Sequence, residues 1–333
     1  MKKETLFSIL KYLISLALGV GILTFIFQNT SIDVLKQQLA QVQVPWLFAS
    51  AGLWLVSHYL RAIRWQMQLK AANYHVPKDN AYAAVLINYL MNLLIPRAGE
   101  LARCSVILRT DKVPLTSVGT VVTERVLDVV LLLIFVLIGF FLSAEHISAL
   151  VTQLMEKGSG KLWMLALLVV FGLIGIVFYW KFQEKLRQFA WIQKIEKIIT
   201  DFLRAAISIK EVENPILYVV YSFSIWICYW LATYTLLKSA AIADDFIPQT
   251  SLLLFAYITN LIGALGVAAP SPGGTGTYHL AVISSFVLFH ACPEVRNCDV
   301  GVSAAFVLHT FQMIFMPILA GSLAYLYLFL KDR

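Results

Sequence analysis

Long apolar runs dominate this sequence, and they constrain its fold more than any other feature. A helix needs roughly 20 residues to cross the hydrocarbon core of a bilayer. Six runs are long enough, at residues 7–27, 46–69, 115–142, 161–181, 215–237 and 301–330. Only 14% of the 333 residues are charged and the mean hydropathy is +0.77, so the polar residues are too few to cover a soluble domain of this size. The sequence therefore predicts an all-α polytopic membrane protein with about six full spans.

The basic residues predict how these helices are oriented. The chain starts with Met-Lys-Lys and then turns apolar, but no small-residue cleavage site follows the run, so we expect it to remain as a first helix. With the N-terminus in the cytoplasm, most loop lysines and arginines lie inside, many of them in residues 181–214. This positive-inside bias predicts an inner (plasma) membrane protein with both termini cytoplasmic. It also explains the net charge of +7 without a nucleic-acid partner.

Two further regions are apolar but too short and too broken to span a bilayer. Residues 81–109 are interrupted by Pro96 and Gly99, which leaves arms of about 20 Å. Residues 250–290 are interrupted by "PSPGGTG" (270–276), where a helix cannot continue. The residues that break this second region are Pro270, Pro272, Gly273, Gly274 and Gly276. We expect two re-entrant helical hairpins, the first entered from the cytoplasm and the second from the outside.

The order helix, hairpin, helix occurs twice, at residues 46–142 and 215–330, with opposite orientation. This order predicts one transmembrane domain over residues 1–333 that contains two inverted half-repeats. Two unrelated kinked pairs are the alternative. Between the halves, residues 182–214 have apolar and charged faces at helical spacing. They predict an amphipathic helix, which lies either on the cytoplasmic leaflet or against a neighbouring protein surface.

Ionisable residues gather around the first hairpin and the helix after it. They are Arg97, Glu100, Arg103, Glu124, Arg125 and Asp128. Each costs roughly 2.5–3.5 kcal/mol when inserted at a helix centre, so such groups persist where they pair or where they work. Their formal charges cancel, and this favours a mutually paired network. The alternative is a site in which one or two arginines bind an anion such as phosphate while the carboxylates orient them.

Several other residues are weaker candidates. In "HYLRAIRW", Arg61 is predicted to reach a cavity and Arg64 to extend to the headgroups at the cytoplasmic end. His279 follows the second break and serves either in hydrogen-bonded packing or in proton transfer, whereas His309 is assigned to packing. Pro317 predicts a kink in the last helix without a site.

The four cysteines do not indicate catalysis or a metal site. Cys104 and Cys228 lie in apolar surroundings, as packing residues do. Cys292 and Cys298 flank a short loop on the predicted outside, where they form either a disulfide or two free thiols. No second pair of zinc-type spacing lies nearby, so we predict no metal.

Four motifs together resemble a known family. They are "RAIRW" (61–65), "NLLIPRAGELAR" (92–103), "VVTERVLDVVLL" (121–132) and "PSPGGTG" (270–276). In order and spacing they are similar to the flippase-like membrane domain of lysylphosphatidylglycerol synthases, over nearly the whole chain. The resemblance implies re-entrant helices, a lipid-accessible cavity, and movement of aminoacylated or other anionic phospholipids between leaflets. The residues that match the family's motifs are Arg97, Gly99, Glu100, Arg103, Glu124, Arg125 and Asp128.

One position departs from that family. Many members have a glutamate shortly after the second break, where this chain has His279. The resemblance therefore gives no support for a carboxylate role there, and a pH-sensitive role becomes available. The cytosolic synthase domain of the family has no counterpart in this sequence, so we expect no aminoacyl transfer.

The leading functional hypothesis is a lipid translocator whose partners are membrane phospholipids, and not an enzyme. The sequence has no GxxxxGK[ST] motif, so we expect no nucleotide cofactor and a drive from a gradient or a partner. Two alternatives stay open. One is an intramembrane enzyme that uses Glu100, Glu124, Asp128 or His279 as acid or base. The other is a structural partner of a separately encoded envelope lipid-modifying enzyme.

Overall fold

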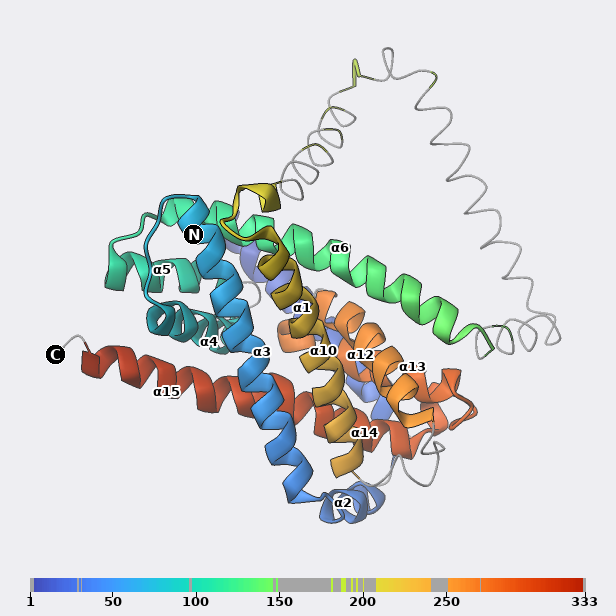
Figure 1. Cartoon of the computed structure of the whole chain (residues 1–333). Helices are drawn as coiled ribbons and strands as arrows, with labels where there is room; N and C mark the ends of the chain where they lie inside the picture. The colour runs from blue at the N-terminus through green and yellow to red at the C-terminus, as the bar shows by residue number, and fades with distance from the viewer. Residues whose placement is uncertain are drawn as a thin grey trace.

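The computed structural model is helical in all the regular structure that it describes (Figure 1), which confirms the all-α class. The described residues are 3–28, 32–95, 98–145, 208–240, 251–269 and 271–331, with a few isolated residues elsewhere. Several sequence predictions lie outside the described residues: Pro96, Arg97, Pro270, the span 161–181 and most of the linker 182–214.

Two long helices pack against each other at the centre of the molecule, α3 (Val44–Ala71) and α10 (Pro215–Ser239) (Figure 1). Each has a proline in its first turn, where the missing N–H group has no helical partner to lose. The side chain of Asn214 caps α10 by accepting the Leu217 amide at 3.0 Å. The two helices are joined by the Ser50 hydroxyl, which donates to the Ala232 carbonyl at 3.3 Å.

The first hairpin consists of α4 (Lys78–Leu94) and α5 (Gly99–Asp111), whose arms pack against each other. The break between them lies where proline and glycine predicted it. Gly99 donates its amide to Oδ1 of Asn92 at 2.8 Å, and a Cβ at Gly99 would lie 2.1 Å from the Asn88 carbonyl oxygen. Glycine is required here because the two arms approach closely, and not only because it interrupts a helix.

The second hairpin consists of α12 (Leu252–Ala268) and α13 (Thr277–Leu288), with a 3₁₀ turn at Pro272–Gly274 between them. Gly273, Gly274 and Gly276 have φ angles of 56°, 73° and 81°. These angles lie in the left-handed region, which residues with a Cβ adopt only with strain. The glycines of the "PSPGGTG" motif are therefore explained by the backbone path of the break.

The break of the second hairpin packs against the end of the first arm of the first hairpin. A Cβ at Gly273 would lie 3.6 Å from Cδ1 of Leu93, at the tip of the first hairpin. On its other side, the second break is covered by α1 (Lys3–Phe27), because a Cβ at Gly276 would lie 2.4 Å from the Gly19 carbonyl oxygen. The irregular backbone of the second break therefore packs between the end of α4 and α1.

Each hairpin is followed by a longer helical segment. After the first comes α6 (Val118–Leu142), and after the second comes α14 (Asp299–His309). α14 continues through a π-helix (Thr310–Phe315) into α15 (Met316–Lys331). The sequence predicts a kink at Pro317, and the irregular π-helical segment ends just before this proline. Proline lacks an N–H group, and its absence disturbs the helical hydrogen bonds of the preceding turn. The short helix α2 (Ile32–Ala40) packs against α14.

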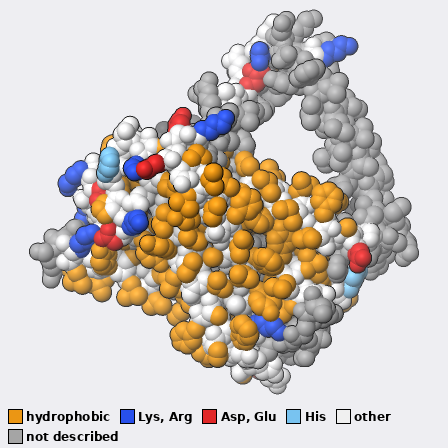
Figure 2. Space-filling view, viewed as in Figure 1, with side chains coloured by type: hydrophobic (Ala, Val, Ile, Leu, Met, Phe, Trp, Pro, Cys, Tyr) orange, Lys and Arg blue, Asp and Glu red, His pale blue; other side chains and the backbone are white. Residues whose placement is uncertain are grey.

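Three helical stretches of the described residues are long and apolar enough to cross a membrane, Leu115–Leu142, Pro215–Ser239 and Asp299–Lys331. Large apolar side chains of α6 face outwards, among them Leu133 at 62% and Phe141 at 69% exposure. Figure 2 shows a broad apolar surface across the molecule, with charged side chains gathered towards one end. An apolar surface of this extent is suited to contact with lipid. The total of about six spans stays a prediction.

The last helix ends beside the start of the first hairpin, at one end of the molecule. Lys331 of α15 donates to Oδ2 of Asp79 at 2.6 Å, so the end of the last helix lies beside the start of the first hairpin. Hydrogen bonds from Lys331 and Tyr327 lower the pKa of Asp79 to about 2, and this carboxylate is ionised at neutral pH. α1 begins and α15 ends at this same end, whereas α2 lies at the opposite end (Figure 1).

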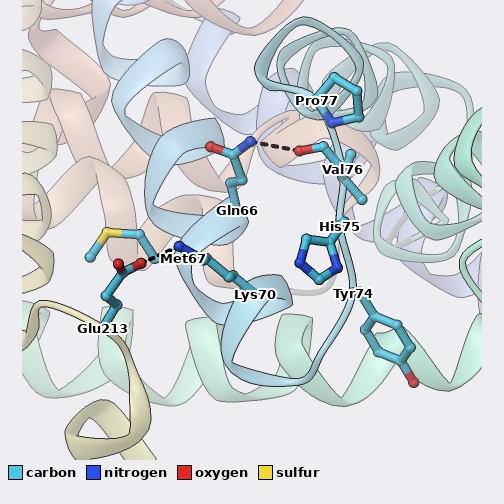
Figure 3. Close-up of a pocket in the computed structure, with 8 residues that line it drawn as sticks. All are labelled: Gln66, Met67, Lys70, Tyr74, His75, Val76, Pro77 and Glu213. Carbon is cyan, nitrogen blue, oxygen red and sulfur yellow. Dashed lines mark hydrogen bonds and ion pairs between the residues drawn. The ribbon is translucent and has the colours of Figure 1, made fainter.

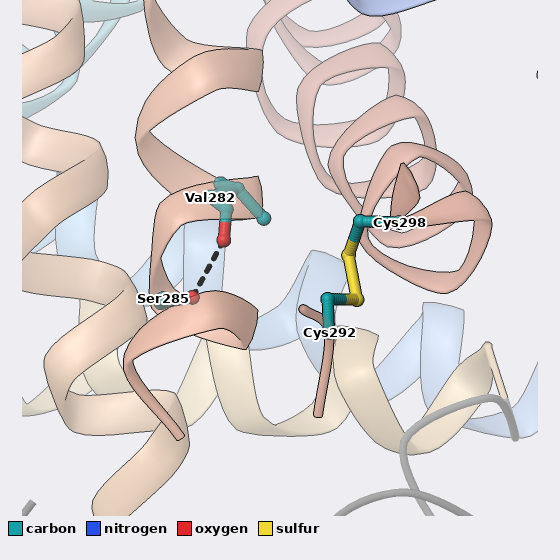
Figure 4. The surroundings of a disulfide bond; sticks show 4 residues. All are labelled: Val282, Ser285, Cys292 and Cys298. Atoms are coloured by element: carbon teal, nitrogen blue, oxygen red, sulfur yellow. Dashed lines mark hydrogen bonds between the residues drawn. A yellow bond between two sulfur atoms is a disulfide. The ribbon is translucent and has the colours of Figure 1, made fainter. Parts of the chain in front are cut away.

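A disulfide lies at the opposite end, beside α13 (Figure 4). It joins Cys292 and Cys298, whose Cα atoms are 5.3 Å apart, so the structure favours the disulfide over two free thiols. Cys104 is buried and unbonded, and Cys228 is half-buried and unbonded. Cys104 lies in a hydrophobic core cluster, as the sequence predicted, whereas Cys228 is only partly covered.

The contacts between helices follow one pattern in both parts of the chain. In each part a central helix, α3 or α10, packs against the hairpin that follows it. Each hairpin also packs against the last helix of the other part: α4 against α15, and α12 against α6. This is the arrangement that an inverted repeat predicts. The assignment of residues 46–142 and 215–330 as two half-repeats stays a prediction.

Candidate functional site

A cluster of charged side chains lies between α3, α5 and α6. Its members, which we call the buried charge cluster, are Arg61, Arg64, Arg103, Glu124 and Asp128. Their side chains are between 0% and 13% exposed. Buried charges in proteins are generally paired and hydrogen-bonded, because an isolated charge is very costly to remove from water.

Glu124 is the centre of the cluster. Its Oε1 accepts from Arg61 Nη1 at 3.0 Å and from Arg64 Nη2 at 2.9 Å, and its Oε2 accepts from Arg103 Nη2 at 2.7 Å. Asp128 accepts from Arg61 at 3.1 Å and from Arg64 at 2.7 Å. The two carboxylates are four residues apart and share one face of α6, as the sequence predicted.

The central helix α10 completes the cluster from the second part of the chain. Arg61 donates through Nε and Nη2 to the hydroxyl of Tyr229, at 3.3 and 3.1 Å. Arg64 donates to the hydroxyl of Ser222 at 3.3 Å. The close contact between α3 and α10 is therefore partly polar, and the two parts of the chain meet at these arginines.

The cluster has a surplus of positive charge, because three guanidinium groups share two carboxylates. Arg103 stacks on the Trp65 ring with 4.6 Å between its guanidinium carbon and the ring centroid. Within the described part of the chain, Nε of Arg64 and Nε of Arg103 are buried without a hydrogen-bond partner. The site therefore retains both charge and donors that an anion could use.

The composition of the cluster corrects the sequence prediction in two respects. Five described residues were expected to cancel one another together with Arg97, and of these five Arg103, Glu124 and Asp128 belong to the cluster. Arg125 and Glu100 form a separate ion pair at 3.0 Å, with side chains 41% and 29% exposed. The buried cluster of described residues carries more positive than negative charge, because two arginines from α3 enter it. The neutrality of the six predicted residues stays a prediction, since Arg97 lies outside the described residues.

Arg64 is the clearest single correction. We predicted that it extends to the headgroups, but its side chain is 0% exposed and bonds to both carboxylates. Arg61, the preferred candidate, lies on the same face of α3 three residues earlier and makes matching contacts. The rotation of α3 about its axis turns both residues towards α6, and local spacing does not specify that rotation.

A cavity with a mixed polar and apolar lining opens at the end of α3 nearest the cluster (Figure 3). Its volume is about 500 Å³, and it is lined by Gln66, Met67, Lys70, Tyr74, His75, Val76, Pro77 and Glu213. Lys70 forms an ion pair with Glu213, and the Gln66 amide donates to the Val76 carbonyl at 2.6 Å. Lys70 follows Arg64 by six residues, about 9 Å along the helix. The sequence analysis missed this cavity, although the polar segment after α3 was a signal for it.

The second hairpin has its own polar contact. His279 and His309 face each other beside the break, with 4.6 Å between ring centroids, and both are buried. His309 also hydrogen-bonds the Gly273 carbonyl at 2.9 Å, which agrees with its assignment to hydrogen-bonded packing. In the described residues, no group of three or more His, Cys, Asp or Glu side chains could hold a metal ion.

Comparison with known proteins agrees with this architecture. The family described as "Lysylphosphatidylglycerol synthase TM region" matches residues 12–321, which is nearly the whole chain. Neither the curated proteins nor the solved structures gave a match. The match covers both hairpins, the buried charge cluster and the histidine pair. The chain belongs to the family of lysylphosphatidylglycerol synthase transmembrane regions.

Proposed function

We propose that this protein binds a lipid with an anionic headgroup, such as an anionic phospholipid, and moves it between the two leaflets. Family membership indicates a membrane protein connected with lipid metabolism. The observation that carries the proposal of translocation is the surplus positive charge of the buried charge cluster. Glu124 lies nine residues after Leu115, about 14 Å along the helical segment and thus near the middle of a bilayer.

The contacts of Arg103 support it as the residue that exchanges partners. Arg61 and Arg64 each bridge both carboxylates, whereas Arg103 bonds only to Glu124. A movement of α5 away from α6 would break one ion pair and present a guanidinium to a phosphate. The planar guanidinium donates two bonds to a phosphate, so the exchange replaces one anion by another. We propose that the headgroup first occupies the cavity beside Lys70 and then reaches Arg103.

The orientation is part of the proposal. We infer that the end with the cavity is cytoplasmic and that the protein lies in the plasma membrane, because the described residues Lys70, Lys78, Lys112 and Lys331 lie at that end. The Cys292–Cys298 disulfide at the opposite end supports this orientation, since disulfides persist in oxidising compartments.

A leaflet assay tests the proposal. Purified protein is reconstituted in liposomes with a fluorescent phosphatidylglycerol, and dithionite is added outside to quench the accessible label. We expect wild type to expose the inner-leaflet lipid and Arg103→Gln to slow this at least ~10-fold, the equivalent of about 1.4 kcal/mol in the barrier. Arg109→Gln is the matched control, because Arg109 is an exposed arginine of the same helix.

Three results would count against the proposal. A wild-type trace equal to that of protein-free liposomes would rule out translocation of this lipid. Equal rates for a zwitterionic lipid would show that the positive cluster does not select the headgroup. Lipid recovered with a new mass would indicate an intramembrane enzyme instead, with Glu124 or Asp128 as a candidate acid or base.

A further inference from the structure

The break of the second hairpin is held by an imidazole pair from two helices. His279 lies in the first turn of α13, and His309 is the last residue of α14. Their side chains face each other with 4.6 Å between ring centroids, and the two residues are 5% and 3% exposed. Nε2 of His309 lies 2.9 Å from the Gly273 carbonyl oxygen. Because a carbonyl only accepts, this nitrogen carries the hydrogen and donates it to the break.

His279 has a buried ring nitrogen, Nδ1, without a hydrogen-bond partner among the described residues. A neutral imidazole has one ring nitrogen that accepts and one that donates, and a protonated imidazole donates from both. The pair can therefore take up a proton at His279 without losing the hydrogen bond from His309 to Gly273.

Few other charges lie near the pair. Tyr278 is the titratable side chain in ring contact with it, 5.7 Å from His309. Asp, Glu, Lys and Arg are absent from the sequences of α12, α13, the π-helix and residues 16–27 of α1. On α14 the acidic residue is Asp299, ten residues before His309 and about 15 Å away along the helix. On α4 the charged residues are Lys78 and Asp79, at the end remote from the break. Three further elements pack against α13 or α14. Their charged residues are Asp33 and Lys36 on α2, Lys238 in the last turn of α10, and Arg296 in the turn Val295–Asn297.

The pair also joins two irregular segments of backbone. His309 immediately precedes the π-helix, and Gly273 is the first of three glycines with left-handed φ in the break. π-Helical segments occur frequently at functional sites, where a helix changes its hydrogen bonding locally. A movement of the break away from α14 must break the bond between His309 and Gly273, so the state of this pair bears on that movement.

In both hairpins the second arm contacts the helix that follows it, but the side chains that make this contact differ in chemistry. In the first hairpin, the second arm contacts the next helix through Arg103 and Glu124, which are charged at any physiological pH. In the second hairpin, the second arm contacts the next helix through His279 and His309, the side chains whose charge changes nearest neutral pH.

We propose that His279 and His309 form a proton-binding site that couples lipid movement to a proton gradient; this inference rests on the proposed function. A proton from the outer solution binds Nδ1 of His279 and makes it an imidazolium. An unpaired charge at this depth is unfavourable, so the protonated state favours separation of the break from α14. The imidazolium also compensates the charge of an anionic headgroup beside it. Release of the proton on the inner side restores the neutral pair.

The test combines a pH gradient with lipid movement. Proteoliposomes are prepared at pH about 7.5 and diluted into pH about 7.5 or about 5.5, a range over which an ordinary imidazole goes from roughly one-tenth to roughly nine-tenths protonated. We expect the acid outside to accelerate wild type, and a protonophore to remove the effect; the acceleration is smaller than the roughly ninefold of an ordinary imidazole, because burial opposes the charged form. His279→Gln and His309→Gln should move lipid at the same rate in both conditions.

A matched control and a second readout keep the outcomes distinct. His290→Asn replaces an exposed histidine whose φ of 57° suits asparagine, and it should respond to the gradient as wild type does. Hydrogen exchange of residues 271–279, corrected for intrinsic rate, should increase at acid pH in wild type and not in His309→Gln. Lipid movement that ignores the gradient would overturn the proton inference alone. No lipid movement together with unchanged exchange would overturn the proton inference and the proposed function.

Discussion

Glu124 shows at the residue scale what holds the buried charge cluster together. It is fully buried, and three arginines from two helices donate to it. Removal of one partner from a buried ionic network leaves uncompensated charge and is strongly destabilising, whereas an exposed ion pair contributes little. The same contacts that make the cluster attractive to an anion therefore also make it a structural centre.

This difference gives a prediction for two carboxylates. Glu124→Gln leaves three buried arginines with one carboxylate, and we expect the free energy of unfolding to fall by about 3–5 kcal/mol. Glu100→Gln removes the partner of the half-exposed Arg125, and we expect a loss of at most about 1 kcal/mol. Reversible unfolding in mixed micelles measures both variants. Equal losses would show that Glu124 does not hold the cluster in the way described.

At the scale of the elements, the hairpins depend on close approach of their arms. In the first hairpin, α4 and α5 come so close at Gly99 that a side chain has no room. The polar groups of the break are partly satisfied within the hairpin, because Asn92 accepts the Gly99 amide. Non-helical backbone at membrane depth needs such partners, since lipid offers none.

Substitution of single glycines tests this account of the hairpin. A Cβ at Gly99 would lie 2.1 Å from the backbone oxygen of Asn88, which no rotamer change can relieve, so we expect Gly99→Ala to destabilise by about 1–3 kcal/mol. Gly52→Ala is the control, because nothing lies within 4 Å of its added Cβ. The control should be neutral or more stable by up to about 1 kcal/mol, through helix propensity. Similar thermal unfolding of the two variants would contradict the close approach.

At the scale of the whole molecule, the structure has two chemically different ends. The start of the first hairpin and the end of α15 are joined through Asp79 and Lys331 at one end. The disulfide lies at the other end, and α2 lies at that end as well. This separation makes the proposed orientation testable with two exposed lysines, Lys78 near the first end and Lys36 on α2.

Labelling of introduced cysteines tests the orientation. In a background where Cys104 and Cys228 are replaced by serine, Lys36→Cys should react with an impermeant maleimide in intact cells. Lys78→Cys should react only after the membrane is permeabilised, because it lies on the cytoplasmic side. Reaction of both variants in permeabilised cells is the control for exposure. If intact cells label Lys78→Cys but not Lys36→Cys, the orientation is the opposite of the one proposed.

Local features of the sequence were sufficient for the class and the element order. Apolar runs predicted the helices, because burial in lipid depends on composition and length. Proline and glycine predicted both breaks, because they act on the backbone where they stand. The sharing of one face by Glu124 and Asp128 followed from helical spacing. These properties depend on residues that are close together in the chain, so they can be predicted from the sequence directly.

The partners of those residues were decided only by the tertiary structure. The sequence did not show that Arg64 turns inwards, that the cluster has three arginines for two carboxylates, or that His309 holds the second break. Each of these contacts joins helices far apart in the chain, and it depends on how each helix is rotated about its own axis. Helical periodicity determines which residues share a face, but only the assembled bundle determines what that face meets.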